Sequence, residues 1–382
     1  MATVIPTTRL DVACDLHGAD DGWPVVLVHG FPYDHHAYDE VAPILVRAGA
    51  RVIVPSMRGY GETRFREAAT PRSGEQAAFG ADLLALLDAL ALERAVLGGY
   101  DWGGRGACVV AALWPERCAG LVSCGGYNLQ DIAGSGAPVA PEAEQRLWYQ
   151  YYLHGERGRR GVTENRRAFA KLLWKLWSPK WAFDDDAFER SAASFDNPDF
   201  VDIVVHSYRH RFALVEGDPT YADIQARLAA QPDIAVPTIA LFGDADGVAG
   251  PVDLTSPTSL QQRSHFTGCF EARILPDIGH DVPQEAPRAY RSCDPRRTLS
   301  APHRGRMQTL RLRAGVAFAG DDRAWRRAIL RGTRREAGQG DEARTGHLPR
   351  GVPNAAPAAR RHAPRGARPP RYRLRGARHG AP

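Results

Sequence analysis

The 382-residue sequence lacks long apolar runs, contains few cysteines and has no lysine in its last quarter. No segment reaches the roughly 18 apolar residues of a membrane-spanning helix, and residues 1–15 lack the basic start and apolar run of a secretory signal. The six cysteines show no metal-ligand or redox spacing, which favours free thiols. These absences argue against a membrane span, a disulfide scaffold and a cysteine metal site, and we expect a cytoplasmic protein.

The charge is divided unevenly along the chain. Residues 291–382 contain 23 arginines, no lysine and six acidic residues, a formal charge of +17, whereas residues 1–290 carry −12. Arg, Ala, Gly and Pro dominate this tail, which therefore cannot bury enough apolar surface to offset its ordering entropy. Arginine neutralises phosphate, so the tail could contact nucleic acid. Because no aromatic interleaving accompanies the charge, we interpret the tail as disordered or translated out of frame, and expect no nucleic-acid partner.

Short β-branched runs alternate with helical stretches in the first 290 residues. The runs are almost continuously apolar, which is typical of strands buried on both faces of a sheet, and they lie at 24–29, 51–55, 94–99, 119–124, 237–243 and 271–276. Residues 75–92 instead have apolar side chains at helical spacing. This alternation predicts an α/β fold with a mostly parallel sheet and right-handed crossovers.

One connection is too long for this alternation. About 110 residues separate the strand ending near Cys124 from the strand beginning near Pro237, far more than an ordinary connection needs. They have helical patterning and many Trp and Tyr residues. We therefore predict three parts. Residues 1–126 and 236–290 form an α/β core, residues 127–235 form an inserted helical cap or lid, and residues 291–382 form the tail.

The most informative stretch is 94–112, in which a strand leads through the turn GYDWG into a helix of small residues. Flanking glycines permit a strained turn and close helix packing. Asp101 stands in the middle of the turn, where an ionised carboxylate can act as a nucleophile, although a helix N-cap is the structural alternative. The stretch resembles the nucleophile elbow of the α/β-hydrolase superfamily, with Asp in place of the usual Ser. It is most similar to the aspartate-nucleophile branch, which includes epoxide hydrolases and haloalkane dehalogenases.

Two further motifs follow in the family's chain order of nucleophile, acid and histidine. In LFGDAD the resemblance places the triad acid at Asp246, with Asp244 as the alternative. In ILPDIGHDVP, after the last predicted strand, it places the catalytic histidine at His280. An intact set of Asp101, Asp246 and His280 argues against the alternative of a non-catalytic binding protein whose basic tail contacts nucleic acid.

Two loops near the N-terminus also resemble this family. VHGFP follows a predicted strand and matches the HGxP oxyanion loop, which implies an oxyanion hole made by the backbone N–H groups of Phe31 and Trp102. MRGYGE, at residues 57–62, resembles the loop that leaves the next strand. Together the motifs extend over residues 24–285.

The predicted cap decides between the branches. Epoxide hydrolases place two cap tyrosines over the nucleophile, and their O–H groups protonate the epoxide oxygen as the ring opens. The segments WYQYY and HSYR resemble these positions, which nominates Tyr149 and Tyr208, with Tyr151 and Tyr152 as alternatives. Aromatic packing of the cap is the structural alternative for each.

A dehalogenase would need N–H donors for a departing halide. Trp102 could supply one, and a second could come from Trp148, Trp174, Trp177 or Trp181. However, HGFP lacks the Asn of HGN-type dehalogenases, and Trp102 and Gln150-Tyr151 replace the Arg and His-Trp of fluoroacetate dehalogenases. We therefore favour hydrolysis of a small apolar epoxide by water through an ester on Asp101, with haloalkane or haloacetate dehalogenation as the alternative. Neither a metal nor an organic cofactor is expected.

Overall fold

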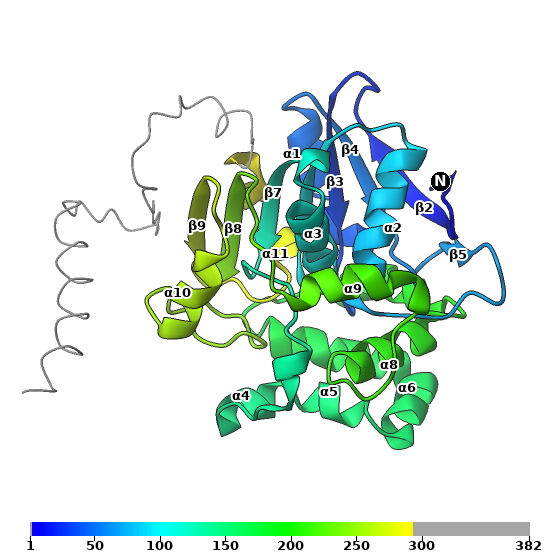
Figure 1. Ribbon diagram of the computed structural model, residues 1–382, viewed down its shortest axis with the longest axis vertical. Helices are drawn as coiled ribbons and strands as arrows, with labels where there is room; N and C mark the ends of the chain where they lie inside the picture. The colour runs from blue at the N-terminus through cyan, green and yellow to red at the C-terminus, as the bar shows by residue number, and fades with distance from the viewer. Residues whose placement is uncertain (1, 293–382) are drawn as a thin grey trace, which may run out of the picture. The chain divides into compact units, whose positions relative to one another are not determined.

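The computed structural model describes residues 2–292, so the tail predicted at 291–382 lies outside the described residues except for the backbone of its first two. Within this range the strands form a nine-stranded sheet, ordered β1-β2-β4-β3-β6-β7-β8-β9 with β5 beside β2 (Figure 1). The strands are β1 (Thr3–Pro6), β2 (Leu10–His17), β3 (Trp23–Val28), β4 (Ala50–Pro55), β5 (Arg64–Phe65), β6 (Ala95–Gly99), β7 (Cys118–Cys124), β8 (Thr238–Gly243) and β9 (Phe270–Leu275).

The sheet is parallel from β4 through β3, β6, β7 and β8 to β9. Its central strand β6 is buried along its whole length, as the apolar runs indicate for strands covered on both faces. The predicted α/β fold with a mostly parallel sheet is confirmed. Strands β1 and β5 pair antiparallel with β2, which is itself antiparallel to β4. These three strands were not predicted because they lack the apolar runs that mark the others.

Helices fill the connections between the strands. α2 (Gln76–Ala89) and α3 (Asp101–Leu113) pack closely, because a Cβ on Gly80 would lie only 2.2 Å from Val109 Cγ1. The other helices are α1 (Val41–Val46), α4 (Pro141–Arg146), α5 (Trp148–Tyr152), α6 (Glu156–Trp177), α7 (Asp185–Ala192), α8 (Phe200–His210), α9 (Ala222–Ala229), α10 (Pro257–Ser264) and α11 (Val282–Glu285). Short 3-10 turns are η1 (His35–Tyr38), η2 (Pro115–Arg117), η3 (Ala133–Gly136), η4 (Ala193–Asp196), η5 (Pro219–Tyr221) and η6 (Pro287–Ser292).

The inserted segment, residues 127–235, contains helices α4 to α9 between β7 and β8. In Figure 1 the helices α4, α5, α6 and α8 gather at one end of the sheet. Trp174 of α6 donates its indole N–H to the carbonyl of Pro32 at 2.7 Å, and the Ser194 hydroxyl donates to Asp34 at 2.6 Å. The segment is therefore fixed to the loop that leaves β3.

Two properties of the described residues bear on the expected class of protein. No helix within residues 2–292 is long and apolar enough to cross a membrane. The cysteines in the same range are unbridged, and they are Cys14, Cys108, Cys118, Cys124 and Cys269. Cys293 lies outside the described residues.

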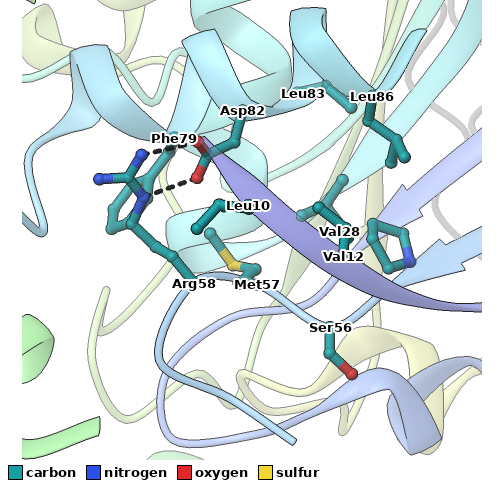
Figure 2. A pocket seen from close by; sticks show the side chains of 11 residues that line it. Leu10, Val12, Val28, Ser56, Met57, Arg58, Phe79, Asp82, Leu83 and Leu86 are labelled. Atoms are coloured by element: carbon teal, nitrogen blue, oxygen red, sulfur yellow. Dashed lines mark hydrogen bonds and ion pairs between the residues drawn. The ribbon is translucent and has the colours of Figure 1, made fainter. Parts of the chain in front are cut away.

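Arg58, from the MRGYGE loop, is 1% exposed and connects three parts of the fold. Its Nε and Nη2 each donate to a different oxygen of Asp82 on α2 at 2.6 Å, and Nη2 also donates to the Tyr221 hydroxyl of the inserted segment at 3.0 Å. Figure 2 shows this pair beside a small apolar cavity whose lining includes Leu10 and Leu86. The cavity lies inside the core, and none of the candidate site residues lines it.

Replacing Arg58 with leucine should leave the Asp82 carboxylate without its partner. Breaking a buried ion pair in this way costs about 3–5 kcal/mol, and we expect a loss of that size in the free energy of unfolding. Equilibrium unfolding in urea at pH 7 measures it. Arg160→Leu is the matched control, because Arg160 is exposed and, among residues 2–292, pairs only with Glu164, so its loss should cost no more than about 0.5 kcal/mol. Equal losses in the two variants would contradict the role assigned to Arg58.

Candidate active site

Asp101 lies in a strained turn between β6 and α3. Its φ is +48°, a left-handed conformation that is uncommon for a residue other than glycine. A Cβ on Gly99 would lie 2.5 Å from the carbonyl carbon of Gly103, and a Cβ on Gly103 would lie 2.1 Å from the carbonyl oxygen of Val28. Both flanking glycines are therefore required, and the turn holds the Asp101 side chain at the carboxyl end of the parallel strands.

The Asp101 carboxylate contacts two neighbouring loops. Its Oδ1 accepts the backbone N–H of Phe31 at 2.9 Å, and its Oδ2 lies 3.9 Å from His280 Nε2. Burial by itself raises the pKa of Asp101, but the interactions with His280, Arg105 and the Phe31 N–H outweigh it and lower the pKa to about 2. The carboxylate is consequently ionised at neutral pH.

His280 connects Asp101 with Asp246. His280 Nδ1 donates to Asp246 Oδ2 at 2.9 Å, and Asp246 Oδ1 accepts the backbone N–H groups of Val248 and Ala249 at 2.7 and 3.1 Å. Burial lowers the pKa of His280, but the charges of Asp246 and Asp101 outweigh it and raise the pKa to about 10. The imidazole is thus held as a cation between two carboxylates.

The alternative acid, Asp244, lies elsewhere. It is exposed, and its carboxylate accepts the backbone N–H of Asp277 at 2.6 Å. The structure therefore brings Asp246, and not Asp244, to His280. Within the described residues the only hydrogen bond that His280 Nδ1 makes is to Asp246.

The predicted oxyanion donors flank the same carboxylate. Phe31 supplies the N–H contact to Asp101, and Trp102 is the second residue of α3, in the first turn, where a backbone N–H has no partner inside the helix. The Trp102 ring stacks between Phe31 and Phe79, with centroids 5.2 Å from each. This packing fixes the first turn of α3 beside the loop that leaves β3.

The rings of the two nominated tyrosines contact each other beside the loop that leaves β3. The rings of Tyr149 and Tyr208 are 5.3 Å apart, and Tyr208 also lies 5.3 Å from the Phe31 ring. The Tyr208 hydroxyl is buried with no hydrogen-bond partner among the described residues, whereas the Tyr149 hydroxyl accepts from Gln150 at 3.0 Å. Burial raises the pKa of both phenols, to about 12 for Tyr149, so both carry a proton at neutral pH.

The alternative tyrosines point elsewhere. Tyr151 is 37% exposed, and its hydroxyl donates to Glu144 at the surface. Tyr152 stacks on Phe169 at 5.9 Å. The structure therefore brings Tyr149 and Tyr208 together and leaves Tyr151 and Tyr152 outside this group.

The tryptophans considered as N–H donors to a departing halide differ in position. The Trp174 indole N–H donates to the backbone carbonyl of Pro32, and the Trp181 ring stacks on the Trp174 ring with centroids 5.4 Å apart. Trp148 packs on Phe169. Trp177 lies 5.1 Å from the His280 ring and 4.9 Å from the Tyr149 ring, which places it in the wall of the candidate site. The Trp102 indole N–H is buried and has no partner among the described residues.

Sequence reasoning missed two arginines. Arg105 lies one turn after Asp101 on α3, and Arg211 follows α8 with its guanidinium 4.5 Å from the centre of the Tyr208 ring. Burial lowers the pKa of Arg105 to about 10, with a further contribution from the charge of Arg211. The only signal in the sequence is a single Arg among the small residues GGRGAC, which does not reveal a partner on a distant helix.

Sequence reasoning also missed the residues that hold the histidine loop. Ser178, at the end of α6, accepts the backbone N–H of His280 at 3.1 Å and donates to Glu285 at 2.6 Å. Glu285 accepts the N–H of Gly279 at 2.7 Å. Beside it, burial and the charge of Glu285 raise the pKa of Asp281 to about 8. These contacts hold the loop between β9 and α11 against the inserted segment.

One group could offer metal ligands. Among the described residues, ligand atoms of Asp34, His35 and His36 lie within 4.8 Å of one another. The Asp34 carboxylate already accepts from the Ser194 hydroxyl at 2.6 Å and from the backbone N–H of His36 at 3.1 Å. With its oxygens engaged in this way, Asp34 serves as a buried link between the β3 loop and the inserted segment.

Comparison with known proteins gives one family. A model of the alpha/beta hydrolase fold matches residues 24–280. Epoxide hydrolase B of Mycobacterium tuberculosis is 33% identical over 163 residues, which cover 38% of this chain and 44% of that protein. The chain thus aligns with less than half the length of this relative. An epoxide hydrolase of Caballeronia sordidicola is 25% identical over 305 residues, 71% of this chain and 86% of that protein.

A solved structure aligns over more of the chain. The crystal structure of a presumed epoxide hydrolase from Klebsiella pneumoniae subsp. pneumoniae is 44% identical, with a TM-score of 0.74. The alignment covers 78% of this chain and 97% of that one. Epoxide Hydrolase A from Mycobacterium thermoresistibile superposes with a TM-score of 0.60 at 20% identity, which indicates a shared fold.

The charge of His280 can be tested by NMR titration of the histidine ring signals, with the His280→Gln variant to assign the resonance. We expect the wild-type imidazole to stay protonated through pH 8, and Asp101→Asn to lower its pKa because one of two flanking anions is lost. Since the folded pKa lies above the unfolded value of about 6.5, the imidazolium stabilises the fold below that pH, and this contribution disappears as the pH rises through about 10. A wild-type midpoint near pH 6.5 would refute this assignment.

Proposed function

The chain belongs to the alpha/beta hydrolase fold family, and we propose that it hydrolyses an epoxide to a vicinal diol through an ester on Asp101. The family assignment confirms the resemblance drawn from the elbow and histidine motifs. The names of the epoxide hydrolase relatives support the proposed reaction. The observation that carries it is an ionised Asp101 facing His280, with the buried O–H groups of Tyr149 and Tyr208 nearby.

In the first half-reaction a carboxylate oxygen of Asp101 attacks an epoxide carbon. The C–O bond of the ring breaks, and the oxygen that leaves takes a proton from Tyr208 or Tyr149. Two facts support these roles. Asp101 is ionised, and the Tyr208 hydroxyl is a buried donor that no other described group uses. In this scheme residues 127–235 act as the cap, because they bring both tyrosines to the core.

In the second half-reaction His280 acts as a base. Ester formation removes the negative charge of Asp101, which is one of the two charges that raise the pKa of His280. The imidazolium can then return its proton to the tyrosinate. Neutral His280, oriented by Asp246, next removes a proton from a water that attacks the carbonyl carbon of Asp101. The backbone N–H groups of Phe31 and Trp102 would stabilise the oxyanion until the diol leaves.

The dehalogenase alternative rests on a different donor. The buried Trp102 indole N–H could donate to a halide. Trp174, one of the candidates for the second donor, already donates its indole N–H to Pro32. The pairing of Tyr149 with Tyr208 favours an epoxide, because phenols can protonate an oxygen and a departing halide requires no proton. The further alternative, a binding protein whose tail contacts nucleic acid, depends on residues outside the described range.

Replacing His280 with glutamine should block the second half-reaction and leave the first intact. After mixing with styrene oxide, intact-mass spectrometry should show the mass of one substrate added to the protein, with steady-state turnover reduced by about a thousandfold. His36→Gln is the control, because His36 is near the surface and pairs with Asp39, so it should turn over normally. Normal turnover by the His280 variant would remove this residue from the mechanism.

Replacing Tyr208 or Tyr149 with phenylalanine should slow ring opening. In the His280→Gln background, rapid-quench mass spectrometry measures ester formation directly, and we expect its rate to fall about 10²-fold when a proton donor is lost. Tyr151→Phe provides a matched control because its hydroxyl donates to Glu144 at the surface. Ester formation that is unaffected by both buried substitutions would exclude these tyrosines as proton donors.

A further inference from the structure

Arg105 is a partly buried cation, and two of its nitrogen atoms have no hydrogen-bond partner among residues 2–292. Its Nε and Nη1 atoms are inaccessible to solvent, and no described residue accepts a hydrogen bond from them. The side chain projects from α3 one turn after Asp101, on the same face of the helix. Nε and Nη1 carry three of the five N–H donors of a guanidinium, and leaving them unmet away from water is costly unless a ligand meets them.

Arg211 reaches the same region from the inserted segment. The residue is 8% exposed, its guanidinium lies over the Tyr208 ring, and Nη1 donates to Gln150 at 3.3 Å. Its Nε and Nη2 atoms are buried and also have no partner among the described residues. The charge of Arg211 acts on Arg105, so two arginines from different parts of the fold bring donors that no described residue meets to the same region.

The charges around the two tyrosines do not balance. The charged groups that act on both Tyr149 and Tyr208 are Asp101, Arg105 and Arg211, which gives two cations against one carboxylate. That carboxylate is already engaged by Phe31 and by the His280 imidazolium, whose own charge is matched by Asp246. One positive charge is left over, and a ligand with a single negative charge would neutralise it.

A groove open to solvent borders Arg211. It has a volume of about 660 Å³, and Arg211 and Gln150 line it together with Leu147, Val139 and Phe212. Two acidic residues also line the groove, but the Asp131 carboxylate accepts the N–H of Gly134 and the Glu144 carboxylate accepts the N–H of Val139. Arg211 therefore brings a positive charge to this groove, with its Nε and Nη2 atoms buried behind the groove wall.

We propose that Arg105 and Arg211 form an anion subsite that binds the carboxylate of an epoxide-bearing acid. This inference rests on the proposed epoxide hydrolysis and narrows its substrate class from a neutral apolar epoxide to an epoxy monocarboxylate. A carboxylate is planar and singly charged, so it matches the fork of a guanidinium and the one unbalanced charge. Held there, it would place the oxirane ring between Asp101 and the tyrosine hydroxyls.

The anion subsite also explains how an anionic nucleophile could attack an anionic substrate. Asp101 and a substrate carboxylate would repel each other in a water-excluded site. The two guanidinium groups offset this repulsion, and they do so only for substrates that carry the negative charge. The subsite should therefore change the selectivity between charged and neutral epoxides more than it changes the chemistry of ring opening.

A matched pair of substrates tests the proposal. 3,4-Epoxybutanoate and 3,4-epoxybutanamide have the same oxirane and nearly the same size, and they differ in charge. We expect kcat/KM for diol formation to be at least about tenfold higher for the acid, as for a charge-assisted bidentate contact. The ratio should fall to about one in Arg105→Met and in Arg211→Met. Arg209→Met is the control, because Arg209 lies on the same helix and pairs with Glu156 at the surface, and it should keep the wild-type ratio.

Calorimetric binding of butanoate and butanamide gives a second readout that needs no turnover. Wild-type protein should bind butanoate and not butanamide, and Arg211→Met should lose the butanoate signal while its circular dichroism stays native. Equal turnover of the two epoxides together with no butanoate binding would overturn the anion subsite and leave epoxide hydrolysis in place. A parallel fall of both activities in the arginine variants, with the ratio retained, would also overturn it, since the arginines would then act on ring opening.

The same measurements separate the anion subsite from the proposed function. Butanoate binding that depends on Arg211, without turnover of either epoxide, would support the subsite and contradict epoxide hydrolysis. Release of chloride from chloroacetate under those conditions would assign the subsite to the dehalogenase alternative. Each result therefore decides for or against the subsite by itself.

Discussion

The turn at Asp101 is the constraint on which the rest of the candidate site depends. Its positive φ is held in place because Gly99 and Gly103 leave no room for a side chain against the backbone of α3 and β3. Such strain persists only where surrounding packing overdetermines it. Here the stacking of Trp102 between Phe31 and Phe79 provides that packing. Moving any of these groups would move the carboxylate away from the Phe31 N–H and from His280.

The protonation state of each ionisable group in the candidate site also depends on the charges of its neighbours. His280 stays protonated since it lies between Asp101 and Asp246, and Asp101 stays ionised since it lies beside His280 and Arg105. A reaction that neutralises Asp101 therefore changes the basicity of His280 at the same moment. In the proposed mechanism, the same loop geometry would in this way keep His280 as an inert cation in the resting state and make it a base in the ester.

The sequence predicted the parts of the site that are encoded locally. Asp101, Asp246 and His280 each lie in the loop or turn that leaves a strand, so a short motif and the chain order were enough to place them at one edge of a parallel sheet. Contacts between distant segments could not be predicted in this way. Nothing local indicates that Arg105 and Arg211 share a region, nor that Ser178 fixes the histidine loop. The antiparallel strands at the sheet edge were not predicted for another reason, since partly exposed strands lack a strong apolar pattern.

The contacts of the inserted segment explain why the site needs both parts of the fold. Trp174 donates its indole N–H to the carbonyl of Pro32, the residue after Phe31, whose backbone N–H contacts Asp101. Four residues later, at the C-cap of the same helix, Ser178 accepts the backbone N–H of His280. Helix α6 thus fixes the loops that carry the donor to Asp101 and the imidazole, although it contributes no side chain to either contact with Asp101. An opening motion of this segment that shifts α6 would therefore disturb both loops together.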